Sequence, residues 1–185
     1  MFENGENNFG IEIWGGGNSG IIANNYCKLN WSGRYIWSAG SGIHVRDSIN
    51  FSILNNIVVG ARHGIEAPFG TVAKNNLYSG LLFEREVSGV VAEGSIGADP
   101  LFVADQAPKL QPNSPCINAG TADARYNDRD GSRNDIGPSG GAWFDPDGWT
   151  TENPVVISFD LSPDQVLEGV EPEIILSEGL AVSAP

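Results

Sequence analysis

Short apolar runs alternate with glycine and asparagine along this chain, and three segments follow one pattern. Each begins with Gly-Ile, a variable residue and an apolar residue: "GIEI" from residue 10, "GIHV" from 42 and "GIEA" from 64. Each then runs on to an Asn-Asn pair, whose second members are Asn25, Asn56 and Asn76. The initial glycines are 32 and 22 residues apart, and these asparagines are 31 and 20 apart. Two independent markers therefore give nearly the same spacing.

A period of 20–22 residues is typical of solenoid coils, and the longer first interval requires an insertion, for which "KLNWSGRYIWSAGS" is the candidate. The short runs bounded by glycine and asparagine predict strands. The leucine frame of leucine-rich repeats and the calcium-binding Gly-Gly-x-Gly-x-Asp nonapeptide are both missing from the sequence. The pattern therefore predicts an all-β fold, a parallel β-helix in which each coil supplies two or three short strands.

In such a coil, equivalent residues stack and the repeated positions acquire physical roles. Stacked asparagine amides can form a hydrogen-bonded ladder along the axis, and asparagine tolerates the left-handed backbone of a sharp corner. Three apolar columns are predicted to form the core: Ile11/Ile43/Ile65, Ile13/Val45/Ala67 and Ile22/Ile53/Ala73.

Composition limits the range of functions. The 185 residues suffice for one domain with an appendage, and 41% hydrophobic residues allow a real core. The net charge of −13 makes nucleic acid a poor partner, and no apolar run is long enough to span a membrane. The first residues lack the basic and apolar regions of a signal peptide. Cys27 and Cys116 are too few for a disulfide scaffold; they could pair, but two buried free thiols are favoured.

The variable residue of the Gly-Ile-x-apolar motif is the main candidate for chemistry. Because its neighbours point inward, Glu12, His44 and Glu66 should point outward and stack at about 4.8 Å. A Glu–His–Glu column could perform general acid/base catalysis, since flanking carboxylates raise the pKa of a histidine. The alternative is a solvated face on which unlike charges stack across strands.

Aromatic and basic residues near this column are candidates for ligand binding. Exposed aromatic rings suit stacking on sugars, and arginine or histidine could neutralise the carboxylate of a uronic acid; alternatively, the aromatic residues cap an open end of the solenoid. The candidate residues are Trp14, Trp31, Tyr35, Trp37, Arg46, Arg62 and His63.

The stretch "DARYNDRDGSRND" offers a third constellation. It does not fit an EF-hand, because alignment on Gly131 puts Tyr126 at position 1 and Gly137 at position 12. Its carboxylates are predicted to bond backbone N–H groups of turns and to pair with Arg129 or Arg133. The alternative is a structural Ca²⁺ ion held by Asp123, Asp128, Asp130 or Asp135.

The segment "GADPLFVADQAPKLQPNSPCINAGTADARYNDRDGSRNDIGPSGGAW" closely resembles the terminal coils of right-handed parallel β-helix proteins of the pectate-lyase-like superfold. The resemblance covers roughly residues 97–142. It implies a right-handed helix, a terminal coil at this position and an extracellular or cell-surface location. Because lyases, hydrolases, epimerases, adhesins and inert stalks share the scaffold, it does not define an activity.

The sequence thus predicts a short right-handed β-helix over residues 1–148 and a C-terminal extension over 149–185. The run "VVISFDLSP" in the extension alternates like a strand and resembles the start of a truncated Ig-like domain. The preferred functional hypothesis is a module that binds polysaccharide on its outer sheet and aromatic loop. The alternatives are a polysaccharide lyase or hydrolase using the Glu–His–Glu column, and a structural solenoid that forms homo-oligomers through its open end or tail.

Overall fold

The structure, a computed structural model, describes residues 9–14, 19–29, 40–46, 50–83, 85–103 and 109–142. Within these ranges the chain forms short strands and one 3₁₀ turn. Their bounds are β1 (Ile11–Ile13), β2 (Gly20–Ala23), β3 (Tyr26–Lys28), β4 (Ser41–Val45), β5 (Phe51–Leu54), β6 (Ile57–Val59), β7 (His63–Ala67), β8 (Val72–Lys74), β9 (Leu77–Ser79), β10 (Glu86–Ser88), β11 (Val91–Glu93), β12 (Ile96–Gly97) and η1 (Ala124–Tyr126).

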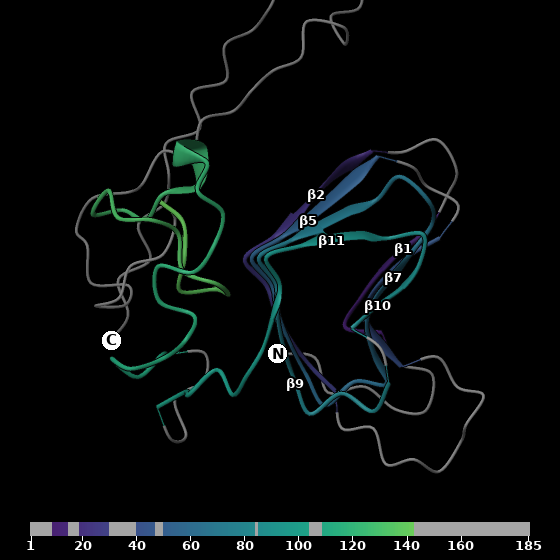
Figure 1. Ribbon diagram of the computed structural model, residues 1–185, viewed down its shortest axis with the longest axis horizontal. Helices are drawn as coiled ribbons and strands as arrows, with labels where there is room; N and C mark the ends of the chain where they lie inside the picture. The colour runs from purple at the N-terminus through teal and green to yellow at the C-terminus, as the bar shows by residue number, and fades with distance from the viewer. Residues whose placement is uncertain are drawn as a thin grey trace, which may run out of the picture. The chain divides into compact units, whose positions relative to one another are not determined.

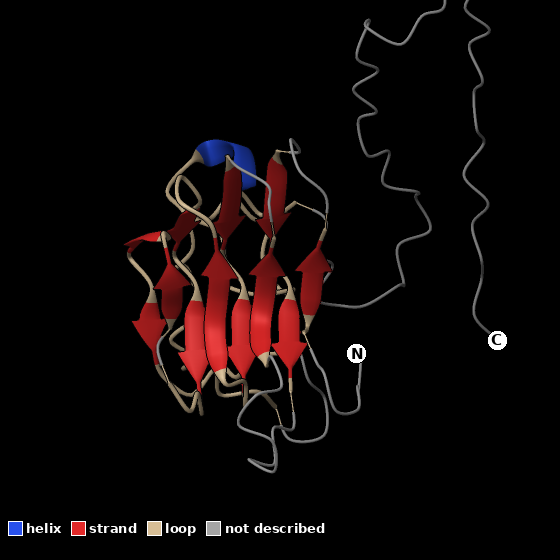
Figure 2. Cartoon of the chain, turned by 90° about the vertical axis from the view of Figure 1, so that its right-hand side faces the viewer, coloured by secondary structure: helices blue, strands red, loops and turns tan. Residues whose placement is uncertain are grey.

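The strands form three parallel sheets, and each turn of the chain contributes one strand to each sheet. Sheet A has the order β1-β4-β7-β10, sheet B β2-β5-β8-β11 and sheet C β3-β6-β9-β12. Figure 1 views the solenoid along the axis on which its coils stack, so the strands of one sheet lie nearly over one another. Figure 2 shows these strands side by side. The chain is therefore an all-β protein with a parallel β-helix of four described coils, as the repeat predicted.

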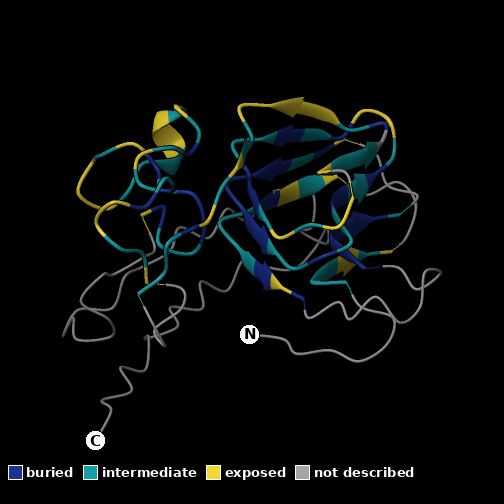
Figure 3. Ribbon diagram, turned by 60° about the horizontal axis from the view of Figure 1, so that its bottom comes forward, coloured by how far each residue is buried: buried dark blue, intermediate teal, exposed yellow. Residues whose placement is uncertain are grey.

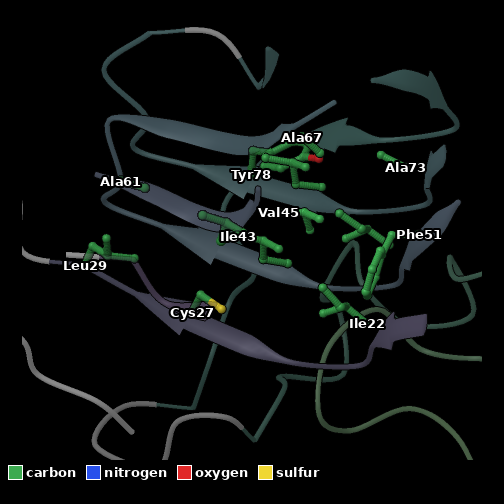
Figure 4. Packing of buried hydrophobic residues seen from close by; sticks show 13 residues of the cluster. Ile22, Cys27, Leu29, Ile43, Val45, Phe51, Ala61, Ala67, Ala73 and Tyr78 are labelled. Atoms are coloured by element: carbon green, nitrogen blue, oxygen red, sulfur yellow. The ribbon is translucent and has the colours of Figure 1, made fainter. Parts of the chain in front are cut away.

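The strand registers confirm the predicted core columns. Ile43 pairs with Ile11 on one side and with Ile65 on the other, and Ile53 pairs in the same way with Ile22 and Ala73. Side chains of these columns fill the interior between the three sheets (Figure 4). Alternation along each strand sends the neighbouring residues outward.

The glycines that begin the repeat are needed because sheet C packs against them. A Cβ added to Gly42 would lie 2.2 Å from Cγ1 of Val58, and one added to Gly64 would lie 2.5 Å from Cε1 of Tyr78. Val58 and Tyr78 are paired neighbours on β6 and β9. Each glycine thus leaves room for the inward side chain of sheet C in its own coil.

The two asparagines of each pair have different roles. The first member, at positions 24, 55 and 75, has a left-handed backbone with φ between 52° and 55°, and Gly94 takes this place in the last coil. The second member forms the predicted ladder. Oδ1 of Asn56 accepts hydrogen bonds from the backbone and side-chain nitrogens of Asn25 at 3.0 Å, and Asn76 accepts from Asn56 at 2.9 and 3.0 Å. One residue turns the corner and the next joins the coils.

The described residues of the segment 98–142 do not add the terminal coil that the resemblance implied. Their described part packs against the outer face of sheet C, where Cys116 and Ile136 contact a cluster that includes Ile57 and Leu77. The corner asparagines hold the segment in place: the amide of Asn24 donates to Asn134, Asp135 and Gly137, and Asn55 accepts from the backbone of Thr121. The segment therefore covers a side of the solenoid.

Cys27 and Cys116 are both buried and free, as favoured by the sequence. They belong to the clusters on the two different faces of sheet C, which separates them.

Within the described ranges, the chain has no helix long and apolar enough to cross a membrane. The described residues belong to one compact unit, Met1–Pro146. The extension over 149–185 lies outside them, so its strand and the boundary at 148 stay predictions.

Candidate functional site on the outer face of sheet A

The predicted Glu–His–Glu column exists on sheet A. Glu12 on β1 pairs with His44 on β4, and His44 pairs with Glu66 on β7. The insertion between the first two coils does not interrupt the column, because β1 and β4 are hydrogen-bonded neighbours in spite of it. In the last coil the next position is occupied by Val87.

His44 lies on the outer face but is covered, which corrects the expectation of an exposed imidazole. Only 7% of the residue is accessible, and the ring of Phe9 lies with its centroid 4.5 Å from that of the imidazole. Nδ1 of His44 is 3.4 Å from Oε1 of Glu12, a contact without hydrogen-bond geometry. The neighbouring carboxylate of Glu66 accepts a hydrogen bond of 2.8 Å from Ser41.

The pKa of His44 is lowered, whereas the flanking carboxylates led us to expect a raised value. Burial is the largest cause; Glu66 and Glu12 act in the opposite direction, and Arg46 adds to the lowering. The imidazole is therefore neutral near pH 7. A neutral imidazole can accept a proton, but this one is almost inaccessible, and the ring of Phe9 lies against it.

Trp14 and Arg46 form a cation–π pair at the end of the strands of sheet A. Trp14 is 62% exposed, and Cζ of Arg46 lies 4.3 Å from the centroid of its ring. Oε1 of Glu12 is 3.5 Å from Nε of Arg46, and the backbone N–H of Arg46 donates to the carbonyl of Ile13. Arg46 thus holds the indole while Glu12 holds the guanidinium.

A second aromatic pair lies where the strands of sheet A begin. Phe83 is 50% exposed; its ring stacks on His63 with centroids 5.5 Å apart, and Cζ of Arg62 lies 5.2 Å from its centroid. His63 and Arg62 were sequence candidates, but Phe83 was missed. The repeat could have found it, because Phe83 follows His63 by one 20-residue period.

The three aromatic candidates of the inserted loop, Trp31, Tyr35 and Trp37, lie outside the described residues. Their part in the predicted binding surface, and the alternative that they cap the solenoid, both stay predictions.

The four acidic candidates for calcium each have other partners. Asp123 caps η1 and pairs with Arg125 at 2.6 Å rather than with one of the predicted arginines. The remaining three accept hydrogen bonds from backbone N–H groups: Asp128 from residues 135 and 141, Asp130 from 132, and Asp135 from 118. In the part of the chain that the structure describes, no three His, Cys, Asp or Glu side chains gather as a metal site. The carboxylates fix turns, as one of the two alternatives predicted.

Comparisons of the chain with family models, curated proteins and solved structures return no match. The class of the protein therefore follows from its own topology: it is a four-coil parallel β-helix in its described part, with a C-terminal segment packed on one side. The likeness to the pectate-lyase-like superfold stays an expectation that rests on the motif in residues 97–142.

Proposed function

We propose that this protein binds carbohydrate on the outer face of sheet A. The observation that carries the proposal is the pair of exposed aromatic rings, Trp14 and Phe83, at opposite ends of the strands of this sheet. Each ring is held from one side by an arginine or histidine, which lowers the entropy lost when a ligand stacks on it. Aromatic rings with exposed faces are suited to the apolar faces of sugar rings.

Polar groups between the two rings complete the proposed surface. Trp14 follows β1 and Phe83 precedes β10, so the rings are separated by about the length of a strand, about 13 Å for Ser41–Val45, and by three strand spacings of about 4.8 Å across the sheet. Over this distance the face offers the carboxylates of Glu12 and Glu66, which can accept hydrogen bonds from sugar hydroxyls. A ligand that reaches both rings would therefore span more than one sugar unit.

Charge favours a neutral polysaccharide over a polyuronate. Arg46 is already paired with Glu12, so its charge is partly neutralised before any ligand carboxylate arrives. The chain carries a net charge of −13, which repels polyanions at low salt. A role in binding extracellular or cell-surface glycans is consistent with these features and is part of the proposal.

The lyase or hydrolase alternative has weaker support. It requires the imidazole of His44 to contact the substrate, but this residue is 7% accessible and lies under Phe9. In the binding proposal, Glu12 of this column positions Arg46, and through it Trp14.

In the experiment, the protein is titrated with soluble neutral glycans and polyuronates. Binding is measured by isothermal titration calorimetry and by the quenching of tryptophan fluorescence. We expect Trp14→Ala to reduce the affinity for a bound neutral glycan at least tenfold, because a stacked aromatic ring contributes about 1.5–3 kcal/mol on the scale of a buried apolar side chain. Phe83→Ala should reduce it by a similar amount.

Ile21→Ala is the matched control, since Ile21 is also exposed but lies on the outer face of sheet B. It should leave the affinity unchanged. Equal binding by wild type and Trp14→Ala would contradict the proposed site. Turnover of a glycan that is lost in His44→Ala would instead support the catalytic alternative.

A further inference from the structure

The C-terminal end of the solenoid is bounded by three edge strands. Strands β10, β11 and β12 each stand last in their sheet, so within the described part of the chain no strand pairs with their outer edges. All three residues of β11 are exposed, including the apolar Val91 and Ala92 (Figure 3). A coil from another copy stacked at this end would extend all three sheets, as successive coils do within the chain.

The inward positions of the last coil differ from those of the coils before it. Glu86 pairs with Ile65 and so takes the place of isoleucine in the first core column, which puts Arg85 beside Gly64 in the glycine column. On sheet C, Gly97 pairs with Tyr78 and so stands where the earlier coils have a side chain. In the first coil, by contrast, the same core column begins with Ile11.

The two charged side chains lie over the end of the core. A Cβ added to Gly97 would lie 2.3 Å from Nη2 of Arg85, so the guanidinium occupies the space that this glycine leaves open. Tyr78, in the coil below, is only 3% accessible, and after burial the carboxylate of Glu86 is the main influence that raises the pKa of its hydroxyl. Arg85 is exposed and retains contact with water, whereas Glu86 is half-buried and its Oε1 is already covered.

We propose that Arg85 and Glu86 close the C-terminal end of the solenoid against stacking by a second copy of the chain. A stacked coil would remove the charge of Arg85 from water and cover the part of Glu86 that is still exposed, and burial of an ion is costly unless it finds a well-aligned partner. Strands of two or three residues would form few backbone hydrogen bonds with a stacked coil, and these would offset little of the cost of burying the charges. Inward-pointing charges on edge strands are a recognised protection of this kind. The inference is independent of the proposed carbohydrate site.

The test restores the repeat by making Arg85→Gly and Glu86→Ile together, which gives the last coil the Gly-Ile start of the other three. The average molar mass of this double variant in solution is measured by light scattering over a range of concentrations, beside that of the wild type. We expect the mass of the double variant to rise with concentration to at least twice that of the wild type. Glu93→Ile is the matched control, since it makes the same exchange on β11 at an outward position paired with Lys74. Its mass should equal that of the wild type.

Three results would overturn the proposal. A folded double variant with the mass of the wild type at every concentration would show that the charges do not prevent stacking. Association of Glu93→Ile to the same extent would show that any loss of charge on this coil suffices. The third result is a failure of the single variant Glu86→Ile to fold, as judged by circular dichroism. This result would show that the carboxylate of Glu86 is required for folding and not for protecting the edge.

Discussion

The asparagine ladder makes the sharpest prediction about stability, because its rungs have the same chemistry but different burial. Asn56 is the inner rung and is completely buried, whereas Asn25 is the rung of the first coil and is half-buried. Replacing each by alanine removes the same side-chain amide. The difference in cost should therefore report on the position of the rung in the stack.

The magnitude follows from the hydrogen bonds of each amide. Oδ1 of Asn56 accepts two, and its NH₂ group, with two hydrogens, is shared among the carbonyls of Ile22 and Leu54 and Oδ1 of Asn76. Four hydrogen bonds at about 1 kcal/mol each give about 4 kcal/mol for Asn56→Ala. The amide of Asn25 donates to Ala23 and Asn56, and water can replace part of this, so Asn25→Ala should cost about 1–2 kcal/mol.

The assay is equilibrium unfolding in urea followed by far-ultraviolet circular dichroism. A loss of about 4 kcal/mol is a large part of the stability of a typical domain, about 5–15 kcal/mol, so the midpoint of Asn56→Ala should fall strongly while the slope stays constant. The reasoning is refuted if Asn25→Ala destabilises the protein as much as Asn56→Ala, or if both cost less than about 1 kcal/mol.

Two further predictions concern packing and pH. Gly42→Ala places a methyl group 2.2 Å from Cγ1 of Val58 and should cost about 1–3 kcal/mol of unfolding free energy; the cost should shrink in a Val58→Ala background, and a cycle of the two changes without coupling would contradict this account. Burial raises the pKa of Asp135 to about 6, above its value of about 3.9 in the unfolded chain. Its contribution to stability is therefore complete below pH 4 and is lost as the pH rises through about 6. Asp135→Asn should thus gain stability relative to the wild type between pH 4 and pH 7, and a difference that stays constant over this range would rule out the effect.

Much of the fold could be predicted because the repeat is local and periodic. The spacing of Gly42 and Gly64 and of Asn56 and Asn76 gave the register that the strands adopt. The terminal segment could not be placed in this way. Its residues have no period, and its position depends on contacts of Cys116 and Ile136 with side chains from other coils.

The residues of the candidate site could be predicted from the sequence, but the side chains that surround them could not. Alternation along the strands identifies Glu12, His44 and Glu66 as neighbours on one face. The burial of His44 depends on Phe9, which precedes the repeat, and therefore its lowered pKa could not be foreseen. Phe83, by contrast, could have been found from the sequence, because it follows His63 by one 20-residue period and stacks on it.

The sequence by itself determined which residues stack and which point inward, because the period of the coil and the alternation of the strand are properties of the local chain. Only the tertiary structure decided what covers each face: the terminal segment on sheet C, Phe9 over His44, and Arg85 with Glu86 at the end of the core. These contacts join residues from different parts of the chain, and their burial sets the energies and pKa values that no periodic pattern records.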